Sequence, residues 1–355
     1  TVRASMVIQL LVERGLSKRG ISPHTVSVAE VLDYAWAWKA DKGGQIMNQL
    51  HILGVTPAWQ RERFTMDAGL SNAVTKLFVK MYNEGLIYRE KRLVNWCPKQ
   101  QTSVSDLEVE TRDEKGKLYY FNYQLVDGGV IEIATTRPET LFGDQAIAVH
   151  PENENLKHLI GKRAIIPLTD IEIPIIGDEH ADPEKGTGAV KITPAHDFDD
   201  YEVGLRHNLT PVCILTSDAK LNDNPVVPTK YRGMDRYAAR AAVLEDIEAA
   251  GLLVKVEDKI IPTPYSERGG VPVEPYLTDQ WFVDAEKLAI PAIKAVEEGK
   301  IKFMPDHRYN LFMSWMKNIR PWTISRQLWW GHHIPAWYDE EGNVYVAETE
   351  AQAIE

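Results

Sequence analysis

Apolar residues recur at helical spacing near the start of the chain. In the first such stretch, the apolar positions on one face are Val28, Val31, Leu32 and Ala35. Ser27 followed by Glu30 has the spacing of a capping box, which predicts the beginning of this helix. We expect Gly43-Gly44 to interrupt or kink the helix and Gly54 to end it.

A second helix is predicted to begin after Asp67, a favourable N-cap, and to end at Gly85. Its apolar positions are Leu70, Val74, Leu77, Phe78 and Met81. A further helix is predicted much later, over residues 285–298.

The pattern changes between residues 117 and 275, where short β-rich runs are separated by turn signals. The runs cover residues 118–124, 130–134, 146–149, 164–168, 171–176 and 212–215. Two or three helices are interspersed, over residues 199–207, 235–250 and 154–160. This mixture predicts a compact, barrel-like α+β module.

Tryptophan distribution supports a separate middle module. All ten tryptophans lie at or before Trp96 or at and after Trp281. The simplest organisation is an α/β chain in which residues 1–116 and 276–355 form parts of one host domain. Residues 117–275 would then be a domain inserted into it.

Composition excludes several classes of protein. The chain has 355 residues, 44% of them apolar and 26% charged, which suits two or three globular domains. No run approaches the roughly 18 apolar residues of a membrane span, so we expect no membrane partner. The net charge of −11 argues against non-specific coating of nucleic acid and leaves room for a local basic site.

Two further features bear on the source of the chain. Its two cysteines cannot form a disulfide framework, which favours a reducing compartment and a cytoplasmic location. It begins with Thr1 and without an initiator methionine, so we expect an excised segment of a longer protein.

The most unusual segment covers residues 186–201. A glycine turn leads into a short strand whose alternation places Lys191 and Thr193 on one side. Three acids follow at the start of a helix, namely Asp197, Asp199 and Asp200. Helix capping explains one of the three well but not the whole set, so we favour a polar ligand site here.

A second candidate is the run of Thr135, Thr136 and Arg137, where an apolar strand ends in two hydroxyls and a guanidinium. This arrangement suits the holding of a polar substrate. When the run is taken alone, a strand-end turn with a surface arginine explains it better.

Other chemistries find little support. Cys97 begins half of a metal knuckle, but Gln100 stands where a second cysteine would be needed, and the histidines lack ligand spacing. We therefore expect no metal site. The chain also lacks a glycine-rich phosphate loop and a Gly-x-Ser-x-Gly elbow.

Several motifs, in order and at matching spacing, resemble valyl-tRNA synthetase. They are RERFTMD (61–67), RLVNWCP (92–98), SDLEVE (105–110), ATTRPET (134–140), GTGAVKITPAHDFDDY (186–201), LTDQWF (277–282) and ISRQLWWGH (324–332). The resemblance covers nearly the whole chain after about residue 30.

This resemblance implies a class I aminoacyl-tRNA synthetase, in which an editing domain interrupts an incomplete, Rossmann-like nucleotide-binding domain. The family's His-Ile-Gly-His and Lys-Met-Ser-Lys-Ser signatures, which serve ATP, do not occur in the chain. Residues 1–9 also depart from the family's pattern, which has an aspartate for the amino-acid ammonium there. The resemblance thus implies that ATP with Mg²⁺ serves only a parent enzyme, and that the segment alone does not activate valine.

The resemblance also implies why an editing site is needed. A valine pocket cannot strongly exclude threonine, and valyl-tRNA synthetase is the standard example of this limit, with discrimination of about a hundredfold. A second, polar site must then hydrolyse threonyl-tRNA and spare valyl-tRNA.

Roles for the candidate residues follow by resemblance. Asp200 would bind the α-ammonium, while Lys191, Thr193 and Asp197 would line the pocket and position water. The ester end and terminal adenosine would be held by Thr135, Thr136 and Arg137. Trp330, in the flank, is the candidate for the synthetic valine pocket, although aromatic stretches are more often core. No cofactor is expected for editing.

Expected partners are the acceptor end of the valine tRNA, with valine and threonine as cognate and non-cognate amino acids, acting on a monomer. One alternative is a non-catalytic tRNA-docking module with an idle editing pocket. Another is that ligation by a complete parent synthetase is the physiological function.

Overall fold

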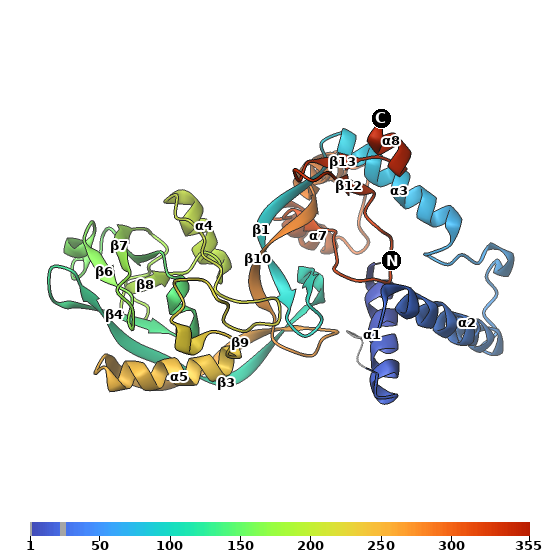
Figure 1. Cartoon of the computed structure of the whole chain (residues 1–355). Coiled ribbons are helices and arrows are strands. Elements are labelled where there is room, and N and C mark those ends of the chain that lie inside the picture. Colours follow the sequence, from blue (N-terminus) through green and yellow to red (C-terminus); the bar gives the residue numbers. More distant parts are fainter. Residues whose placement is uncertain (1, 22–25) are drawn as a thin grey trace. The chain divides into compact units, whose positions relative to one another are not determined.

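The computed structural model describes residues 2–21 and 26–355, so Thr1 of the divergent amino-terminal stretch lies outside the described residues. The chain divides into two compact units (Figure 1). The first unit comprises Thr1–Glu90 and Gln280–Glu355, and the second comprises Lys91–Asp279. The predicted inserted module, residues 117–275, falls within the second unit.

Three helices open the first unit: α1 (Val2–Lys18), α2 (Val28–Ile52) and α3 (Ala68–Asn83). The predicted capping box at Ser27 and Glu30 is present, and the Asp67 side chain caps α3 by accepting from the amide of Leu70. The predicted interruption at Gly43-Gly44 is wrong, because α2 runs through both residues. Two glycines in one exposed stretch lower helix propensity without breaking the backbone hydrogen bonds.

The remaining elements of the first unit come mainly from the end of the chain. They are α6 (Ala285–Glu297), α7 (Arg308–Lys317), β11 (Trp322–Thr323), β12 (Ala336–Tyr338), β13 (Val344–Val346), α8 (Glu350–Ile354) and the 3₁₀ turn η2 (Trp59–Arg61). Two apolar clusters hold this unit together, one around Val12, Val31 and Trp330 and one around Phe78 and Trp281.

The chain passes between the units within two long strands, β1 (Ile87–Cys97) and β10 (Glu274–Val283). With β2 (Thr102–Val104) and β11 they form a four-stranded sheet in the order β11-β10-β1-β2. The sequence pattern predicts no strand before residue 118, so β1 and β2 were missed.

The second unit is built on a seven-stranded sheet. Its strands are β3 (Val109–Leu125), β4 (Val130–Thr135), β5 (Ala146–Val149), β6 (Arg163–Ile165), β7 (Glu172–Gly177), β8 (Ala189–Ile192) and β9 (Leu253–Ser266). The order is β4-β3-β6-β7-β5-β8, with β9 also paired to β3. Because β4 and β8, at the two ends of this order, contact each other, the sheet curls into a half-barrel.

Strand alternation fills the interior of the half-barrel. Over the last five residues of β3, every second side chain is buried in the main apolar cluster, at Phe121, Tyr123 and Leu125. All four residues of β5 are buried, because Ile147 and Val149 face this cluster while Ala146 and Ala148 face a second one. The second cluster includes Val203 of α4 (Phe198–Arg206), which places that helix against the other face of β5 and β8.

Helix α5 (Arg236–Ala249) packs against β9 and the 3₁₀ turn η4 (Pro138–Gly143), as Figure 1 shows beside β3 and β9. The other short turns are η3 (Asp106–Glu108), η5 (Lys157–Leu159) and η6 (Thr229–Tyr231). Two predictions are wrong here: residues 154–160 contain only η5, and residues 212–215 form no strand beyond one bridge at Leu215. The mixed α/β chain with a β-rich unit confirms the predicted fold class.

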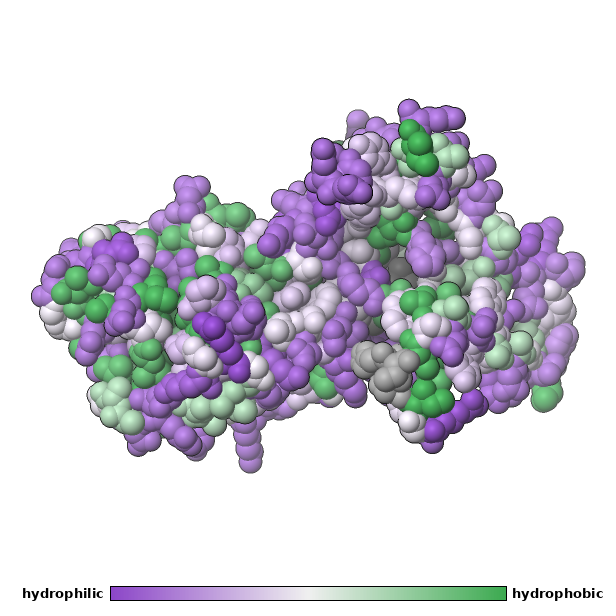
Figure 2. All heavy atoms as spheres, in the orientation of Figure 1, coloured by the Kyte–Doolittle hydropathy of each residue, from purple (hydrophilic) through white to green (hydrophobic). Residues whose placement is uncertain are grey.

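Polar side chains cover much of the face seen in Figure 2, and apolar ones form small groups between them. Among the described residues, no helix combines the length and apolar character needed to cross a bilayer.

Candidate functional site

The predicted alternation in β8 brings Lys191 and Thr193 together. The Lys191 ammonium donates to the Thr193 hydroxyl, lies 2.9 Å from Oδ1 of Asp144, and is 3.0 Å from the Thr140 hydroxyl. An ammonium has three protons, and each has an acceptor here. Lys191 is 7% exposed, so its charge is held inside the half-barrel and positions Thr193.

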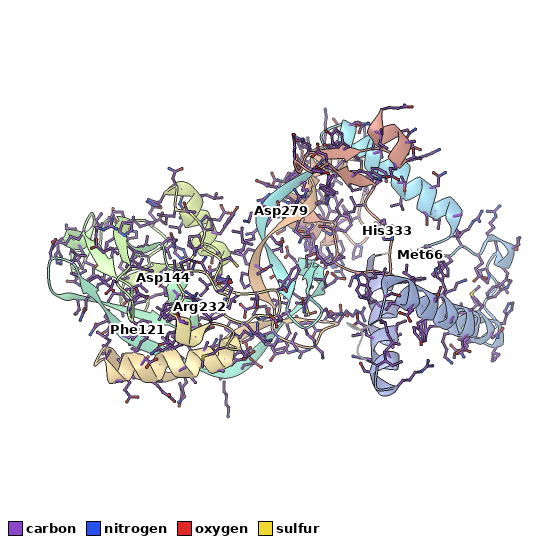
Figure 3. The ribbon with its side chains drawn as sticks, in the orientation of Figure 1. Met66, Phe121, Asp144, Arg232, Asp279 and His333 are labelled. Atoms are coloured by element: carbon purple, nitrogen blue, oxygen red, sulfur yellow. The ribbon has the colours of Figure 1, made fainter. Side chains whose placement is uncertain are left out.

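Asp144 is the counter-ion that sequence reasoning missed. It is fully buried, and its two oxygens accept from the Thr193 hydroxyl at 2.6 Å and from the Tyr123 hydroxyl at 2.6 Å. Figure 3 labels Asp144 among the side chains of the second unit. Burial and the Asp144 carboxylate raise the pKa of Tyr123, so the phenol stays protonated and keeps donating. A lone acid between Gly143 and a buried strand was the available signal.

Asp200 lies in the first turn of α4 and is 6% exposed. Its Oδ2 accepts from the backbone amide of Thr193 at 2.8 Å. Its Oδ1 lies 3.6 Å from Nε2 of His180, another residue that sequence reasoning missed. The two ends of the β8–α4 connection are therefore tied together through the Asp200 carboxylate.

Asp197 is the N-cap of α4, as the capping interpretation of this acidic cluster expected for one of its members. Its Oδ1 accepts from the backbone amides of Asp199 at 2.9 Å and Asp200 at 3.2 Å. Asp197 and Asp199 are exposed, whereas Asp200 is buried. The three acids thus have different environments, and only Asp200 is enclosed beside Thr193.

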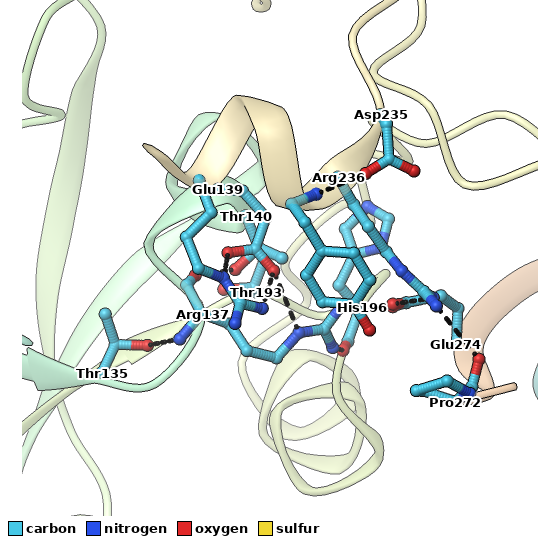
Figure 4. A network of polar contacts seen from close by, with 12 residues as sticks. Thr135, Arg137, Glu139, Thr140, Thr193, His196, Asp235, Arg236, Pro272 and Glu274 are labelled. Atoms are coloured by element: carbon cyan, nitrogen blue, oxygen red, sulfur yellow. Dashed lines mark hydrogen bonds and ion pairs between the residues drawn. The ribbon is translucent and has the colours of Figure 1, made fainter. Parts of the chain in front are cut away.

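Arg137 lies in a network of ion pairs (Figure 4). Its guanidinium pairs with Glu274, lies 3.5 Å from Glu139, and donates to the backbone carbonyl of His196 at 2.9 Å. Burial alone would lower the pKa of Arg137, but the carboxylates of Glu274 and Glu139 raise it.

Two more arginines complete this network. Arg240 donates to both oxygens of Glu139 at 2.8 Å, and Arg236 pairs with Glu274. The network of Arg137, Glu139, Arg236, Arg240 and Glu274 contains three guanidiniums and two carboxylates, which leaves one positive charge in excess. We call it the arginine network.

The strand-end threonine closes the adjoining loop. The Thr135 hydroxyl accepts from the amide of Arg137 at 3.0 Å, and the Thr140 hydroxyl donates to the carbonyl of Arg137 at 2.9 Å. Thr136 lies between them and is half-buried, as is Thr135. The run is thus a strand-end turn, but its arginine is largely enclosed rather than a free surface group.

His196 joins the segment around Ile214 to this region. Burial, together with the charges of Arg137 and Lys191, lowers the pKa of His196, so the ring is neutral. Its Nε2 accepts from the amide of Ile214 at 3.0 Å. This bond anchors residues 212–215, which sequence reasoning had assigned to a strand.

A pocket of roughly 460 Å³ lies beside the end of β4. It is lined by Leu118, Tyr120, Ala134, Lys185, Gly186, Thr187, Ala189, Val190, Glu257, Asp258 and Lys259. Ala134 directly precedes Thr135, so the pocket adjoins the loop that carries two of the candidate residues.

Trp330 belongs to the first unit and packs in its core. It is 1% exposed and contacts the ring of Trp36, with centroids 4.9 Å apart, and that of Phe64 at 6.5 Å. In this structure Trp330 is a core residue, and its place in a substrate pocket stays a prediction. The other candidate residues all lie in the second unit. Over the parts of the chain that the structure describes, no three histidine, cysteine or acidic side chains gather as metal ligands.

Comparison with protein families gives a match over residues 3–355 to the model for tRNA synthetases class I (I, L, M and V). The chain belongs to this family. A class I synthetase relationship accounts for the β-rich second unit between two pieces of the first.

A relative of known name is similar over nearly the whole chain. It is the valine–tRNA ligase of Francisella tularensis subsp. tularensis, strain SCHU S4 / Schu 4. The two are 54% identical over 352 residues, which is 99% of this chain and 38% of the relative. The chain therefore spans well under half the length of that synthetase.

Proposed function

We propose that the second unit hydrolyses the ester of threonine mischarged onto the valine tRNA, and that the chain is part of a valine–tRNA ligase. The observation that carries the proposal is the enclosed Asp200 carboxylate, which accepts from the backbone amide of Thr193 at 2.8 Å. The similarity to a named valine–tRNA ligase supports the choice of amino acids.

Asp200 and Thr193 would divide recognition between them. Oδ1 of Asp200, whose other oxygen is held by the Thr193 amide, would accept the α-ammonium of the aminoacyl group. The Thr193 hydroxyl donates its proton to Asp144 and accepts from Lys191, so one lone pair remains. That lone pair would accept from the side-chain hydroxyl of threonine, which valine lacks.

The chemical step is an ester hydrolysis. Water adds to the carbonyl carbon, the bond to the ribose oxygen breaks, and that oxygen takes a proton while free threonine leaves. Because the ester is already activated, a positioned water among preorganised polar groups is sufficient. Asp197, at the exposed rim, would help to position this water, and Lys191 would hold Thr193 in place.

The tRNA end would approach from the β4 side. We place the ester end at Thr135 and Thr136 and the terminal adenosine in the adjoining pocket. The excess positive charge of the arginine network would attract the phosphates of the acceptor end. In this scheme Arg137 acts through the field of the network rather than as a free side chain.

Deacylation of threonyl-tRNA and valyl-tRNA, measured in parallel, tests the proposal. We expect hydrolysis of the threonyl ester only, and a loss of at least about a hundredfold in Asp200→Ala, because a buried charge partner of the substrate is removed. Asp199→Ala is the matched control, since Asp199 is exposed on the same helical turn.

Equal rates for Asp200→Ala and the wild type would overturn the proposal. Tight binding of deacylated tRNA without any turnover would instead favour the alternative, a docking module with an idle pocket.

At the level of the parent protein, we propose ligation of valine to its tRNA by a cytoplasmic, monomeric enzyme. We expect ATP with Mg²⁺ to be needed only for that reaction, because neither ATP signature of the family occurs in these 355 residues. Editing would need no cofactor.

A further inference from the structure

A short turn after β7 is attached to α4 at both ends of the helix. Asp178 accepts from Arg206 at 2.9 Å and pairs with Nε2 of His207 at 2.8 Å, both at the carboxyl end of α4. The same side chain accepts from the amide of His180 at 2.9 Å. The His180 ring is thereby held at the other end of the helix, beside Asp200.

The contact between His180 and Asp200 involves the carboxylate oxygen that faces away from Thr193. Oδ2 of Asp200 is occupied by the Thr193 amide, and Oδ1 lies 3.6 Å from Nε2 of His180. The His180 side chain is 28% exposed, so water and protons reach the ring. Among the described residues, Oδ1 accepts from no backbone amide, so a cation that binds Asp200 at this oxygen shares it with His180.

We propose that His180 is a positioning and competing residue of the ammonium site: its imidazolium and the substrate's α-ammonium exclude each other at Oδ1 of Asp200. This inference rests on the proposed function of Asp200. It makes substrate affinity, rather than the chemical step, depend on the protonation of His180.

The charges around His180 favour its protonated form when no substrate is bound. From α4, Asp200, Asp199 and Asp197 all act on the ring. The nearby Asp200 carboxylate raises the pKa of His180, and partial burial opposes this effect.

Groups on the other neighbouring elements do not reverse this balance. Asp178, on the same turn, is already paired with Arg206 and His207. The residues packed around the adjoining Ala181 are apolar, and they are Ala146, Ala148, Ile192 and Val203. The acids of α4 are therefore the charges that set the state of His180.

The pH dependence of KM for threonyl-tRNA deacylation by the full 355-residue chain tests the inference. Because the pKa of His180 is raised above the ordinary histidine value of about 6.5, at least about nine-tenths of the rings carry a proton at pH 5.5. Exclusive competition then raises KM of the wild type at least about tenfold relative to His180→Gln, with equal kcat. Near pH 8 the two KM values should agree.

Two further variants separate competition from a merely structural role. His180→Lys carries a permanent cation, so we expect a raised KM at pH 8 as well as at pH 5.5. His158→Gln, at an exposed histidine of the same unit, should follow the wild type throughout. A KM ratio near one at pH 5.5 between wild type and His180→Gln, or a low KM in His180→Lys at pH 8, would overturn the inference.

A titration of the His180 ring by NMR needs no turnover. A non-hydrolysable 3′-threonylamido-adenosine should lower the pKa of His180 in the full chain, because bound ammonium displaces the proton. An unchanged pKa in the presence of the bound analogue would sink the inference. Absence of deacylation at every pH would count against the proposed function alone, since the NMR shift still decides the role of His180.

Discussion

The ion pair of Lys191 and Asp144 is unusual because it is buried inside the half-barrel, where hydroxyl groups are its other polar partners. Asp144 is fully buried, and Lys191 is opposite Ile147 in the register of β5 and β8. Such a pair adds little net stability over an apolar core, but removal of one partner leaves an unpaired buried charge. The pair therefore fixes Thr193 at the cost of making both partners indispensable to each other.

Lys191→Met tests this mutual dependence. The substitution introduces an unbranched apolar side chain of similar length and leaves the buried Asp144 carboxylate without its counter-ion. We therefore expect the free energy of unfolding to fall by about 3–5 kcal/mol. Urea denaturation followed by circular dichroism measures the change. The double variant Lys191→Met, Asp144→Asn should regain part of the loss.

Lys157→Met is the matched control for that measurement. Lys157 forms an exposed pair with Glu154, and such pairs contribute at most about 1 kcal/mol. Similar losses for Lys157→Met and Lys191→Met would contradict the assigned role of the buried pair.

At the residue scale, the sequence was sufficient to predict features that depend on neighbouring residues in the chain. The shared side of Lys191 and Thr193 follows from strand alternation alone, and the capping by Asp197 follows from its place before a helix. Asp144, His180 and Glu274 were missed because their partners are supplied by other elements. Only the folded chain shows that His180 reaches Asp200, twenty residues further on.

Helix α4 is the element on which the candidate site depends most. Asp197 caps it, Asp200 faces Thr193 from its first turn, and Asp178 holds its carboxyl end. The capping role and the chemical role of Asp197 can be separated, because asparagine caps a helix about as well as aspartate does.

We expect Asp197→Asn to unfold within about 0.5 kcal/mol of the wild type, and Asp197→Ala to lose about 1 kcal/mol, because alanine offers no acceptor to the helix amides. Thermal unfolding gives the stabilities, and threonyl-tRNA deacylation gives the activities. If Asp197 positions water through its charge, Asp197→Asn should lose activity despite its stability. Full activity in Asp197→Asn would restrict Asp197 to capping.

The stability of the carboxyl end of α4 should depend on pH through Asp178. Although burial alone would raise it, hydrogen bonds from Arg206, the His180 amide and His207 lower the pKa of Asp178 to about 2. A folded-state pKa below the unfolded value of about 3.8 means that the ionised group stabilises the fold above pH 4, and that this contribution is lost as the pH falls.

We therefore expect wild type to exceed Asp178→Asn by about 2 kcal/mol in unfolding free energy at pH 6 and by about 1 kcal/mol near pH 3. Denaturant unfolding at a series of pH values measures the difference. A gap that stays constant between pH 6 and pH 3 would show that the Asp178 charge is not what stabilises this end of α4.

At the element scale, sequence patterns placed most helices and strands of the second unit within a few residues. The failures have physical reasons. Residues 212–215 read as a strand because they are apolar, yet their backbone is held by the His196 ring at Ile214 rather than by a ladder. Residues 43–44 read as a break, yet α2 continues because helical hydrogen bonds outweigh the roughly 1 kcal/mol propensity cost of each glycine.

At the scale of the whole molecule, every candidate editing residue from Thr135 to Glu274 belongs to one unit. That unit has its own apolar core and is joined to the rest through β1 and β10. Tryptophan distribution and motif resemblance suggested this organisation. Sequence alone did not reveal that the two connections are paired strands.

A chain of residues 91–279 should unfold in one cooperative transition, because its core is complete within those residues. We expect it to hydrolyse threonyl-tRNA with kcat within about threefold of the full chain, if tRNA contacts elsewhere affect only KM. Asp200→Ala in the same short chain is the control. Non-cooperative unfolding would show that the second unit needs the first for its stability.

The alternation in β8 also determines which kinds of mutation leave the site intact. Substitutions between Ala189 and Thr193 change one contact at a time, and compensating changes across the half-barrel can follow. Insertion or deletion of one codon there would exchange the two faces of the strand, turning Lys191 away from Asp144 while an apolar neighbour took its place. Segment length, more than any single side chain, is therefore the quantity that selection or a design library must hold constant at this strand.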